Sequence, residues 1–422
     1  MKAGSGAKIG PVAGTFLVAT TMIGSGIFML PATVAAIGSI SVIGWVIAAI
    51  GALLIGLTLA ILSRDEPHGT YLDSIAHVLG PVAGLVSTIL FVISMLISLP
   101  MVAVAAAGYT SFLFPALSSN TATIALTHAY IWIFVAVSWR GARLIASVGT
   151  ASLVVGLVPL ILLATLGWGK FDAEIFRSSW NISGKSNASA AMSATLILFM
   201  AYLGLENASI VREQIENPRR NVPIATVCGI LFSTLIYIAS TTVVSGLIPA
   251  ATLAKSAAPF ADATAVLLGA VAAMLVAVCA AAKAAGTLGA LQLETVECVV
   301  VMKRQVAGGS LSRSGTNIAV GVIASAIALF TASPNVASQF GVLATALVTT
   351  SILSLVLAGV ALAKTRSGLP RATGIASVLF CVGLLAAQPL KDMMVAALLC
   401  IATAALTAIL IAWRRRMAAT AN

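Results

Sequence analysis

Long apolar runs are the feature that most constrains how this chain can fold. The 422 residues contain twelve runs of mostly apolar residues, each about 20 residues long, the length at which a helix crosses the hydrocarbon core of a bilayer. Only 8% of the residues are charged and 60% are hydrophobic, whereas soluble globular proteins carry about 25% charged residues. So few polar side chains cannot cover the surfaces of soluble domains. The sequence therefore predicts an all-α integral membrane protein with twelve transmembrane helices. It excludes a soluble enzyme, a disordered chain and a disulfide-rich secreted domain.

The distribution of basic residues predicts the orientation of these helices. We expect the helices at 10–37, 41–63, 81–114, 121–139, 141–168, 189–214, 222–248, 268–301, 316–331, 337–363, 372–388 and 391–413. Cytoplasmic loops of membrane proteins carry an excess of Lys and Arg. With the N-terminus in the cytoplasm, 17 of the 23 Lys and Arg residues fall on the cytoplasmic side, and the outer side holds Lys170, Arg177, Lys185, Lys255 and Lys391. This bias predicts that both termini are cytoplasmic.

Two of the expected helices contain residues that interrupt a helix. The first contains Gly24-Ser25-Gly26 at mid-depth, and the sixth contains Gly204 followed closely by Glu206. A broken helix frees backbone N–H and C=O groups, which a membrane tolerates only where protein or a water-filled cavity surrounds them. Paired interruptions in corresponding positions of two inverted repeats indicate the binding site of a transporter. A packing face of small residues at Gly24-Ser25-Gly26 is the alternative interpretation.

The two interruptions predict a site for a molecule with a carboxylate and an amine. N–H groups at the start of the second half of helix one would hold the carboxylate, and carbonyl groups freed in helix six would hold the ammonium group. We expect the carboxylate to bind at Thr21, Ile23, Gly24, Ser25 and Gly26, and the amine at the carbonyls of Met200, Ala201 and Leu203. Such binding requires no covalent chemistry, no cofactor and no metal, so the sequence does not predict an enzyme.

Several motifs resemble those of one known transporter family. Residues 23–31, which read IGSGIFMLP, resemble the first-helix signature of the amino acid–polyamine–organocation (APC) superfamily. Residues 216–225, which read ENPRRNVPIA, resemble the loop after helix six in the branch of basic amino acid/polyamine antiporters. That branch includes arginine/agmatine and putrescine/ornithine exchangers. Residues 204–206 and 256–260 are similar to the same branch.

The resemblance covers most of residues 8–290 and implies a fold. It implies a LeuT-like inverted repeat of five plus five helices, with helices 1 and 6 discontinuous and two extra C-terminal helices. The chain would then be a single transporter domain, 1–422, with a first repeat at 8–168, a second at 189–363 and the extra helices at 372–413. The resemblance also implies alternating access in a bacterial inner membrane.

Three positions depart from the pattern of that branch. The aromatic residues that clamp the substrate of the arginine/agmatine exchangers correspond here to Met200 and Leu291, and an asparagine of helix three corresponds to Leu99. A pocket shaped by these residues lacks the cation–π and amide partners of a guanidinium group, and an unpaired guanidinium would be poorly compensated there. The departures predict a substrate smaller or more apolar than arginine.

Glu206 and Lys283 are the only ionisable residues that we expect at membrane depth. A charged side chain at the bilayer centre costs about 3 kcal/mol on insertion scales, so such residues are functional candidates. The resemblance implies that Glu206 is a proton-linked gating carboxylate, and a structural carboxylate is the alternative. Lys283 shares a helix face with Gly286 and Thr287. We expect its ammonium group to replace a coupling cation or to pair with Glu206, and a lysine that snorkels from a shorter helix is the alternative.

These features favour secondary transport over the other functions of membrane proteins. The leading interpretation is an antiporter that exchanges an amino acid for an amine or for another amino acid, with protons linked through Glu206, Lys283 or both. A proton-coupled symporter or an exporter of neutral amino acids is the alternative, and a basic amino acid/polyamine exchanger ranks behind these. An intramembrane enzyme would need a cluster of His, Asp or Glu in the spans, and the expected spans contain too few such residues. The sequence does not distinguish a channel or a sensor from a transporter. The expected partners are the substrate, protons and lipid, with no nucleic acid, and the oligomeric state stays open, a homodimer included.

Overall fold

The computed structural model describes residues 9–63, 70–140, 142–206, 209, 215–307 and 311–388, together with positions 403, 405, 407 and 409. The described residues form helices and no β-sheet, and one isolated bridge pairs Ile9 with Ile215. This all-helical architecture agrees with the prediction. The expected helix at 391–413 lies almost entirely outside the described residues.

Nine helices in the described part of the chain are long and apolar enough to cross a membrane. They are α3 (Ser41–Leu62), α5 (Pro81–Leu113), α6 (Asn120–Ser138), α7 (Ala142–Leu166), α11 (Pro218–Leu247), α14 (Ala270–Ala307), α15 (Arg313–Phe330), α16 (Val336–Thr365) and α17 (Gly368–Ala386). Each coincides with one of the apolar runs, and the ends differ by a few residues. The runs form helices because a helix satisfies all its backbone hydrogen bonds within the segment, as a lipid environment requires.

The first and sixth apolar runs form broken helices. Helix α1 (Pro11–Met22) ends before Gly24, whose backbone is extended, and the chain resumes as a 3-10 turn, η1 (Ser25–Phe28), and a short helix, α2 (Leu30–Ala35). In the sixth run, α9 (Asn187–Leu198) continues as the 3-10 turn η5 (Phe199–Tyr202) and ends at the extended residue Leu203. The interruptions expected from the glycines are therefore present, although most of the second half of helix six lies outside the described residues.

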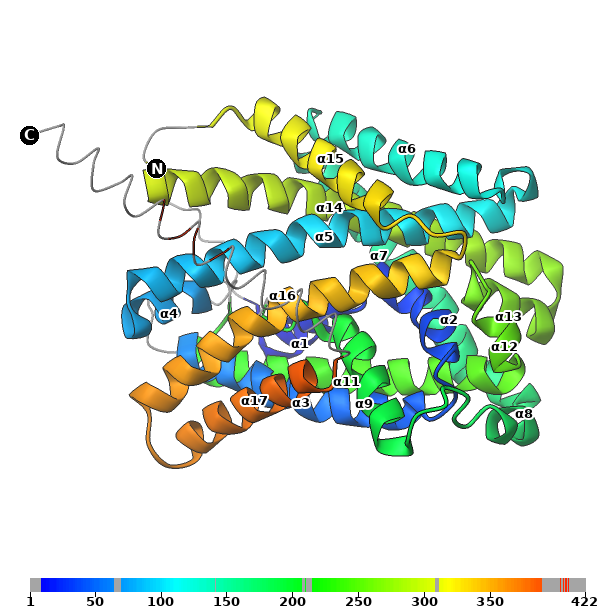
Figure 1. Ribbon diagram of the computed structural model, residues 1–422, viewed down its shortest axis with the longest axis horizontal. Coiled ribbons are helices and arrows are strands. Elements are labelled where there is room, and N and C mark those ends of the chain that lie inside the picture. Colours follow the sequence, from blue (N-terminus) through cyan, green and yellow to red (C-terminus); the bar gives the residue numbers. More distant parts are fainter. Residues whose placement is uncertain are drawn as a thin grey trace, which may run out of the picture.

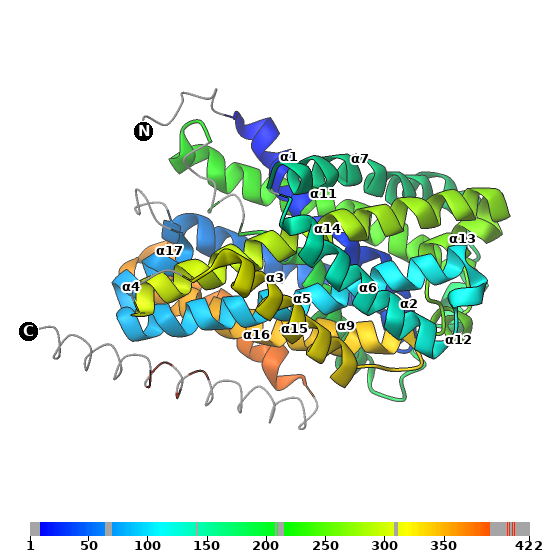
Figure 2. The same cartoon turned by 90° about the horizontal axis from the view of Figure 1, so that it is seen from above.

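The long helices run along one direction and form a bundle with two distinct ends (Figure 1). Helices α5 and α14 lie side by side along the bundle, and α16 packs against α5 (Figures 1 and 2). One end carries the short helix α4 (Tyr71–Leu79). The other end carries α8 (Ala173–Ser178), α12 (Ala250–Leu253) and α13 (Pro259–Leu268), with the 3-10 turns η3 (Pro115–Leu117) and η4 (Gly167–Lys170). Helices α12 and α13 occupy the segment between the expected helices at 222–248 and 268–301.

Candidate functional site

A cavity of about 740 Å³ lies where the two broken helices meet. Its walls come from η1, η5, α5, α14 and α16, and it reaches Tyr71 at the start of α4. Ten of the residues predicted for the site line this cavity: Thr21, Gly24, Ser25, Gly26, Met200, Ala201, Leu203, Glu206, Lys283 and Leu291. The volume lies in the range of pockets that enclose small ligands. Among the described residues, no group of three or more His, Cys, Asp or Glu side chains could hold a metal ion.

Two glycines allow the broken segments to approach each other closely. Gly204 has a φ of 107°, and a Cβ atom added there would lie 3.1 Å from the carbonyl oxygen of Thr21. The Thr21 hydroxyl lies 3.4 Å from the carbonyl oxygen of Gly204. A Cβ atom on Gly26 would lie only 2.8 Å from the sulfur of Met200. The glycines therefore serve the close approach of two backbones as well as the local breaks.

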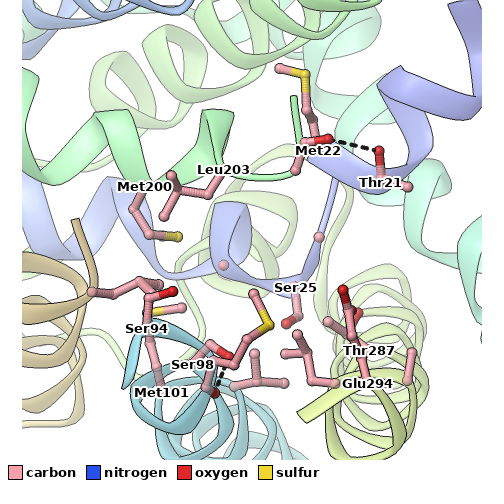
Figure 3. Close-up of a pocket in the computed structure, with 18 of the residues that line it drawn as sticks. Thr21, Met22, Ser25, Ser94, Ser98, Met101, Met200, Leu203, Thr287 and Glu294 are labelled. Atoms are coloured by element: carbon pink, nitrogen blue, oxygen red, sulfur yellow. Dashed lines mark hydrogen bonds between the residues drawn. The ribbon is translucent and has the colours of Figure 1, made fainter. Parts of the chain in front are cut away.

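Ser25 presents an unsatisfied hydroxyl to the cavity. The residue is only 1% exposed, and its Oγ atom has no hydrogen-bond partner among the residues that the structure describes. Figure 3 shows Ser25 at the pocket, between the chain break and helices α5 and α14. A buried hydroxyl without a partner is destabilising by about 1–3 kcal/mol, so a polar ligand group that bonded it would regain that free energy.

The carbonyl groups of helix six keep part of their hydrogen-bonding capacity. The carbonyl of Met200 accepts from the N–H of Leu203 at 3.2 Å, and the carbonyl of Ala201 accepts from the hydroxyl of Tyr237 at 3.2 Å. Because a carbonyl oxygen has two lone pairs, each group can accept a further bond. An ammonium group in the cavity could therefore bind to these carbonyls.

Lys283 is buried in the middle of α14 and reaches the cavity. It is 5% exposed, and its stem packs against Gly156 of α7, where a Cβ atom would lie 2.6 Å from the Cγ atom of Lys283. Across the described ranges its ammonium group forms no ion pair, and Glu206 is not its partner in this structure. The low exposure also places the side chain inside the bundle rather than at a membrane surface.

Glu206 and Tyr71 lie at the part of the cavity that approaches α4. The N–H of Gly204 donates to Oε2 of Glu206 at 3.0 Å, so this carboxylate also stabilises the break. Burial, and then the carboxylate of Glu206, raise the pKa of Tyr71 above its usual range, while a hydrogen bond with Ser354 acts in the opposite direction. Tyr71 therefore stays a neutral hydroxyl beside the carboxylate.

Two predicted site residues do not line the cavity. Ile23 and Leu99 are 2% and 0% exposed and pack into the surrounding core. On α5 the cavity is lined instead by Ser94, Ser98 and Met101 (Figure 3). These three positions follow the i, i+4, i+7 spacing of one helix face, and Leu99 lies beside that face.

Glu294 is a cavity residue that the sequence reasoning missed. It lies on α14 within the candidate span Ala270–Met302 and lines the cavity with an exposed side chain. The expectation that Glu206 and Lys283 are the only ionisable residues at membrane depth stays a prediction, while Glu294 and Glu297 are two further ionisable residues that line the cavity. Periodicity could have found it, because Glu294 follows Lys283 by eleven residues and Thr287 by seven, which places all three on one helix face. Figure 3 shows Thr287 and Glu294 on the same helix.

Aromatic side chains pack between the cavity and the end of the bundle that carries α13. The hydroxyl of Tyr109 donates to the carbonyl of Phe28 at 2.9 Å and accepts from the N–H of Phe260 at 3.3 Å. The ring of Phe28 meets the rings of Tyr109 and Phe260 edge-on, with centroids 5.9 Å and 5.5 Å apart. All three side chains are buried. The broken first helix is thereby tied to α5 and α13 on this side.

Known proteins similar to this chain are named as antiporters or transporters. A family model described as amino acid permease matches residues 9–292. The cadaverine/lysine antiporter of Escherichia coli (strain K12) is 34% identical over 272 residues, which are 64% of this chain and 61% of that protein. The putrescine transporter PotE of the same strain is 30% identical over 370 residues, covering 84% and 83% of the two chains. PotE of Haemophilus influenzae is 31% identical over 257 residues, 60% and 58% of the two chains.

Proposed function

We propose that this chain, which belongs to the amino acid permease family, is a multi-pass membrane antiporter that exchanges an amino acid for a related amine or amino acid by alternating access. The observation that carries the proposal is the cavity at the crossing of the two broken helices, where Ser25 presents an unpaired hydroxyl. The names of the similar proteins, an antiporter and two putrescine transporters, support the same class. No step of this function requires covalent chemistry.

In the proposed complex, both ends of an amino acid bind to the breaks. The carboxylate binds at the Gly24-Ser25-Gly26 segment, where Ser25 is the polar side chain available to it. The ammonium group binds to the carbonyls of Met200 and Ala201, each of which has one lone pair left. Met200 and Leu291 then shape the side-chain pocket.

The fold that we propose is a five-plus-five inverted repeat within twelve membrane helices. The repeats are 8–168 and 189–363, and their first helices are the two that are broken and meet in the middle of the bundle. This correspondence is what an inverted repeat produces. We propose that the remaining helices, 372–413, stand outside the repeat.

We propose that the α4 end of the bundle faces the cytoplasm of a bacterial inner membrane. Arg313 and Lys364 lie at this end, where α15 begins and α16 ends (Figure 1). An excess of basic residues is typical of cytoplasmic loops. The cavity reaches Tyr71 at this end, and Tyr109 packs with Phe28 on the other side. In this orientation the structure is an inward-facing conformation.

We propose that the substrate is smaller or more apolar than arginine. Met200 and Leu291 line the cavity and offer no aromatic face to a guanidinium group. The apolar lining also supports the alternative of a proton-coupled symporter or an exporter of neutral amino acids. Proton linkage through Glu206, Lys283 or both is part of the proposal, because both side chains reach the cavity from within the bundle.

Counterflow in proteoliposomes tests the proposed exchange. Vesicles that contain the full chain are preloaded with single amino acids or amines, and uptake of the labelled compound is measured at several pH values. We expect uptake that depends on the compound inside the vesicle. A symporter would instead transport into empty vesicles along a proton gradient, and failure of every compound to stimulate uptake would refute the exchanger.

A further inference from the structure

Helices α6, α14 and α15 lie together along one side of the bundle (Figure 1). A buried amide network joins them. Nε2 of Gln292 donates to Oδ1 of Asn317 at 2.7 Å, and Nδ2 of Asn317 donates to the carbonyl of Val135 at 2.8 Å. Gln292 and Asn317 are only 1% and 3% exposed. Because buried side-chain amides that find partners favour one arrangement of their helices, this network sets how α6 and α15 are aligned.

The alignment of α6 and α15 brings two arginines to the same level of the bundle. The two helices are antiparallel neighbours, and Nε2 of His128 on α6 lies 3.2 Å from the carbonyl oxygen of Ser325 on α15. Twelve residues further along the chain from His128 is Arg140, just beyond the end of α6, and twelve residues before Ser325 is Arg313, the first residue of α15. Arg140 and Arg313 therefore lie opposite each other at the α4 end of the bundle.

Both arginines keep hydrogen-bond donors that a ligand can use. Nε and Nη2 of Arg313 lie 3.0 Å and 3.1 Å from the carboxylate oxygens of Glu297. A guanidinium group has five N–H donors, so three of them remain on Arg313 after these two bonds, and its side chain is 73% exposed. Arg140 is exposed as well, and its guanidinium group has no partner among the residues that the structure describes. Free guanidinium donors of this kind suit a phosphate group.

The surroundings of the two arginines suit a lipid better than a soluble anion. Trp139, which is 56% exposed, precedes Arg140, and Trp132, which is 40% exposed, lies seven residues earlier on the same face of α6. On α15, Ile318 and Val322 are 42% and 52% exposed. Tryptophan is enriched where membrane proteins cross the interface between lipid and water. The exposed apolar side chains offer a surface to acyl chains directly beside the arginines.

We propose that Arg140 and Arg313 bind the phosphate of an anionic phospholipid, whose acyl chains lie along α6 and α15 toward Trp132. Basic pockets between membrane helices on the cytoplasmic side are typical of such lipid sites. The site goes beyond the proposed exchange, and its position in the cytoplasmic leaflet rests on the orientation proposed above. Because Arg313 also holds Glu297, which lines the central cavity, one residue connects the bound lipid to the wall of that cavity.

Lipid titration of the purified full chain in a neutral detergent tests the site without transport. Thermal unfolding is followed while dioleoylphosphatidylglycerol, dioleoylphosphatidylcholine or inorganic phosphate is added, and the shift of the melting temperature gives an apparent Kd for each. Arg140→Gln removes one guanidinium group and leaves the ion pair of Arg313 with Glu297 in place, whereas Arg140→Lys retains the charge. Arg371→Gln is the control, because Arg371 is an exposed residue of α17, which packs against α3 and α16.

We expect the wild type to bind phosphatidylglycerol about tenfold or more tightly than phosphatidylcholine, because both arginines attract the anionic headgroup. Arg140→Gln should weaken the binding of phosphatidylglycerol about fivefold, and Arg313→Gln at least as much. Arg140→Lys should weaken it by about twofold, since a point charge replaces the planar fork, and Arg371→Gln should leave it unchanged.

Three results would overturn the lipid site. The first is equal affinity of the wild type for the two lipids, and the second is an equal loss in Arg140→Gln and Arg371→Gln. The third is inorganic phosphate that binds as tightly as phosphatidylglycerol, which would show a site for a free anion instead. The titration measures no transport, so a failure of the proposed exchange leaves the outcome for this site unaffected.

Discussion

Replacement of Lys283 by methionine should make the protein more stable and less active. The side chain is 5% exposed, it has no ion-pair partner among the described residues, and its stem packs against Gly156. Methionine keeps an unbranched stem of similar volume and removes the ammonium group. On insertion scales a lysine at the centre of a membrane helix costs about 3 kcal/mol.

Hydration of Lys283 in the cavity limits how much Lys283→Met can stabilise the protein. Because Lys283 reaches a cavity of about 740 Å³, water hydrates part of the ammonium group, and we expect a gain of about 1–2 kcal/mol out of the full insertion cost. Since 1 kcal/mol corresponds to about 2–4 °C in proteins of 150–250 residues, the melting temperature should rise by a few degrees. Exchange should fall by about tenfold or more, because the ammonium group that we propose for proton linkage is gone.

Both effects can be measured on one preparation of Lys283→Met. Thermal unfolding in detergent reports the stability, and counterflow at several pH values reports the exchange and its proton linkage. Lys255→Met is the control, because Lys255 is exposed and lies outside this cavity, and it should change neither quantity. Full exchange with an unchanged pH dependence would show that Lys283 has no part in coupling. A lower melting temperature would show that the ammonium group is stabilised in the bundle, contrary to the reasoning from its burial.

Three further substitutions test the two breaks and the aromatic contacts on the side of the cavity toward α13. Gly204→Ala should destabilise the protein by about 1–3 kcal/mol and reduce exchange, because its φ of 107° and the nearby carbonyl of Thr21 oppose a side chain. Gly80→Ala is the control, because Gly80 has a φ of 96° but open space around it, and it should lower the melting temperature less. Equal losses of stability would show that the close approach of the two broken helices at Gly204 does not oppose a side chain. Tyr109→Phe should lower the stability by about 1–3 kcal/mol because the buried carbonyl of Phe28 loses its donor, and an unchanged melting temperature would show that this bond is dispensable. Ser25→Ala should raise the melting temperature, because it removes a buried hydroxyl that has no partner among the described residues. It should also weaken substrate binding about threefold to tenfold, whereas unaltered binding would remove Ser25 from the site.

The breaks were predictable because their causes are local. Glycine weakens a helix, and each break combines a glycine with a nearby polar residue, Ser25 after Gly24 and Glu206 after Gly204. Ten of the twelve predicted site residues line the cavity, because most of them lie at or beside these breaks. The roles of these residues remain predictions until the substitutions are measured.

The residues that sequence reasoning misplaced depend on helix rotation. Leu99 and Ser98 are neighbours on α5, yet only Ser98 lines the cavity. Both fit an apolar span, and the choice between them follows from how α5 packs against α14 and α16. Glu294 was missed because it lies near the charged end of a long apolar run, although its spacing from Lys283 places it on the cavity face.

The sequence by itself determined the class of the protein, the positions of the nine long helices in the described part of the chain and the two breaks. In lipid, the backbone N–H and C=O groups of each apolar run must form hydrogen bonds within the run, so a run of the right length forms a helix. A glycine beside a polar residue weakens that helix locally. Only the tertiary structure decided which helix faces meet, and therefore that Ser25, Lys283 and Glu294 share one cavity. Those contacts join segments more than 250 residues apart in the chain, and they are set by side-chain packing between helices, which no local pattern encodes.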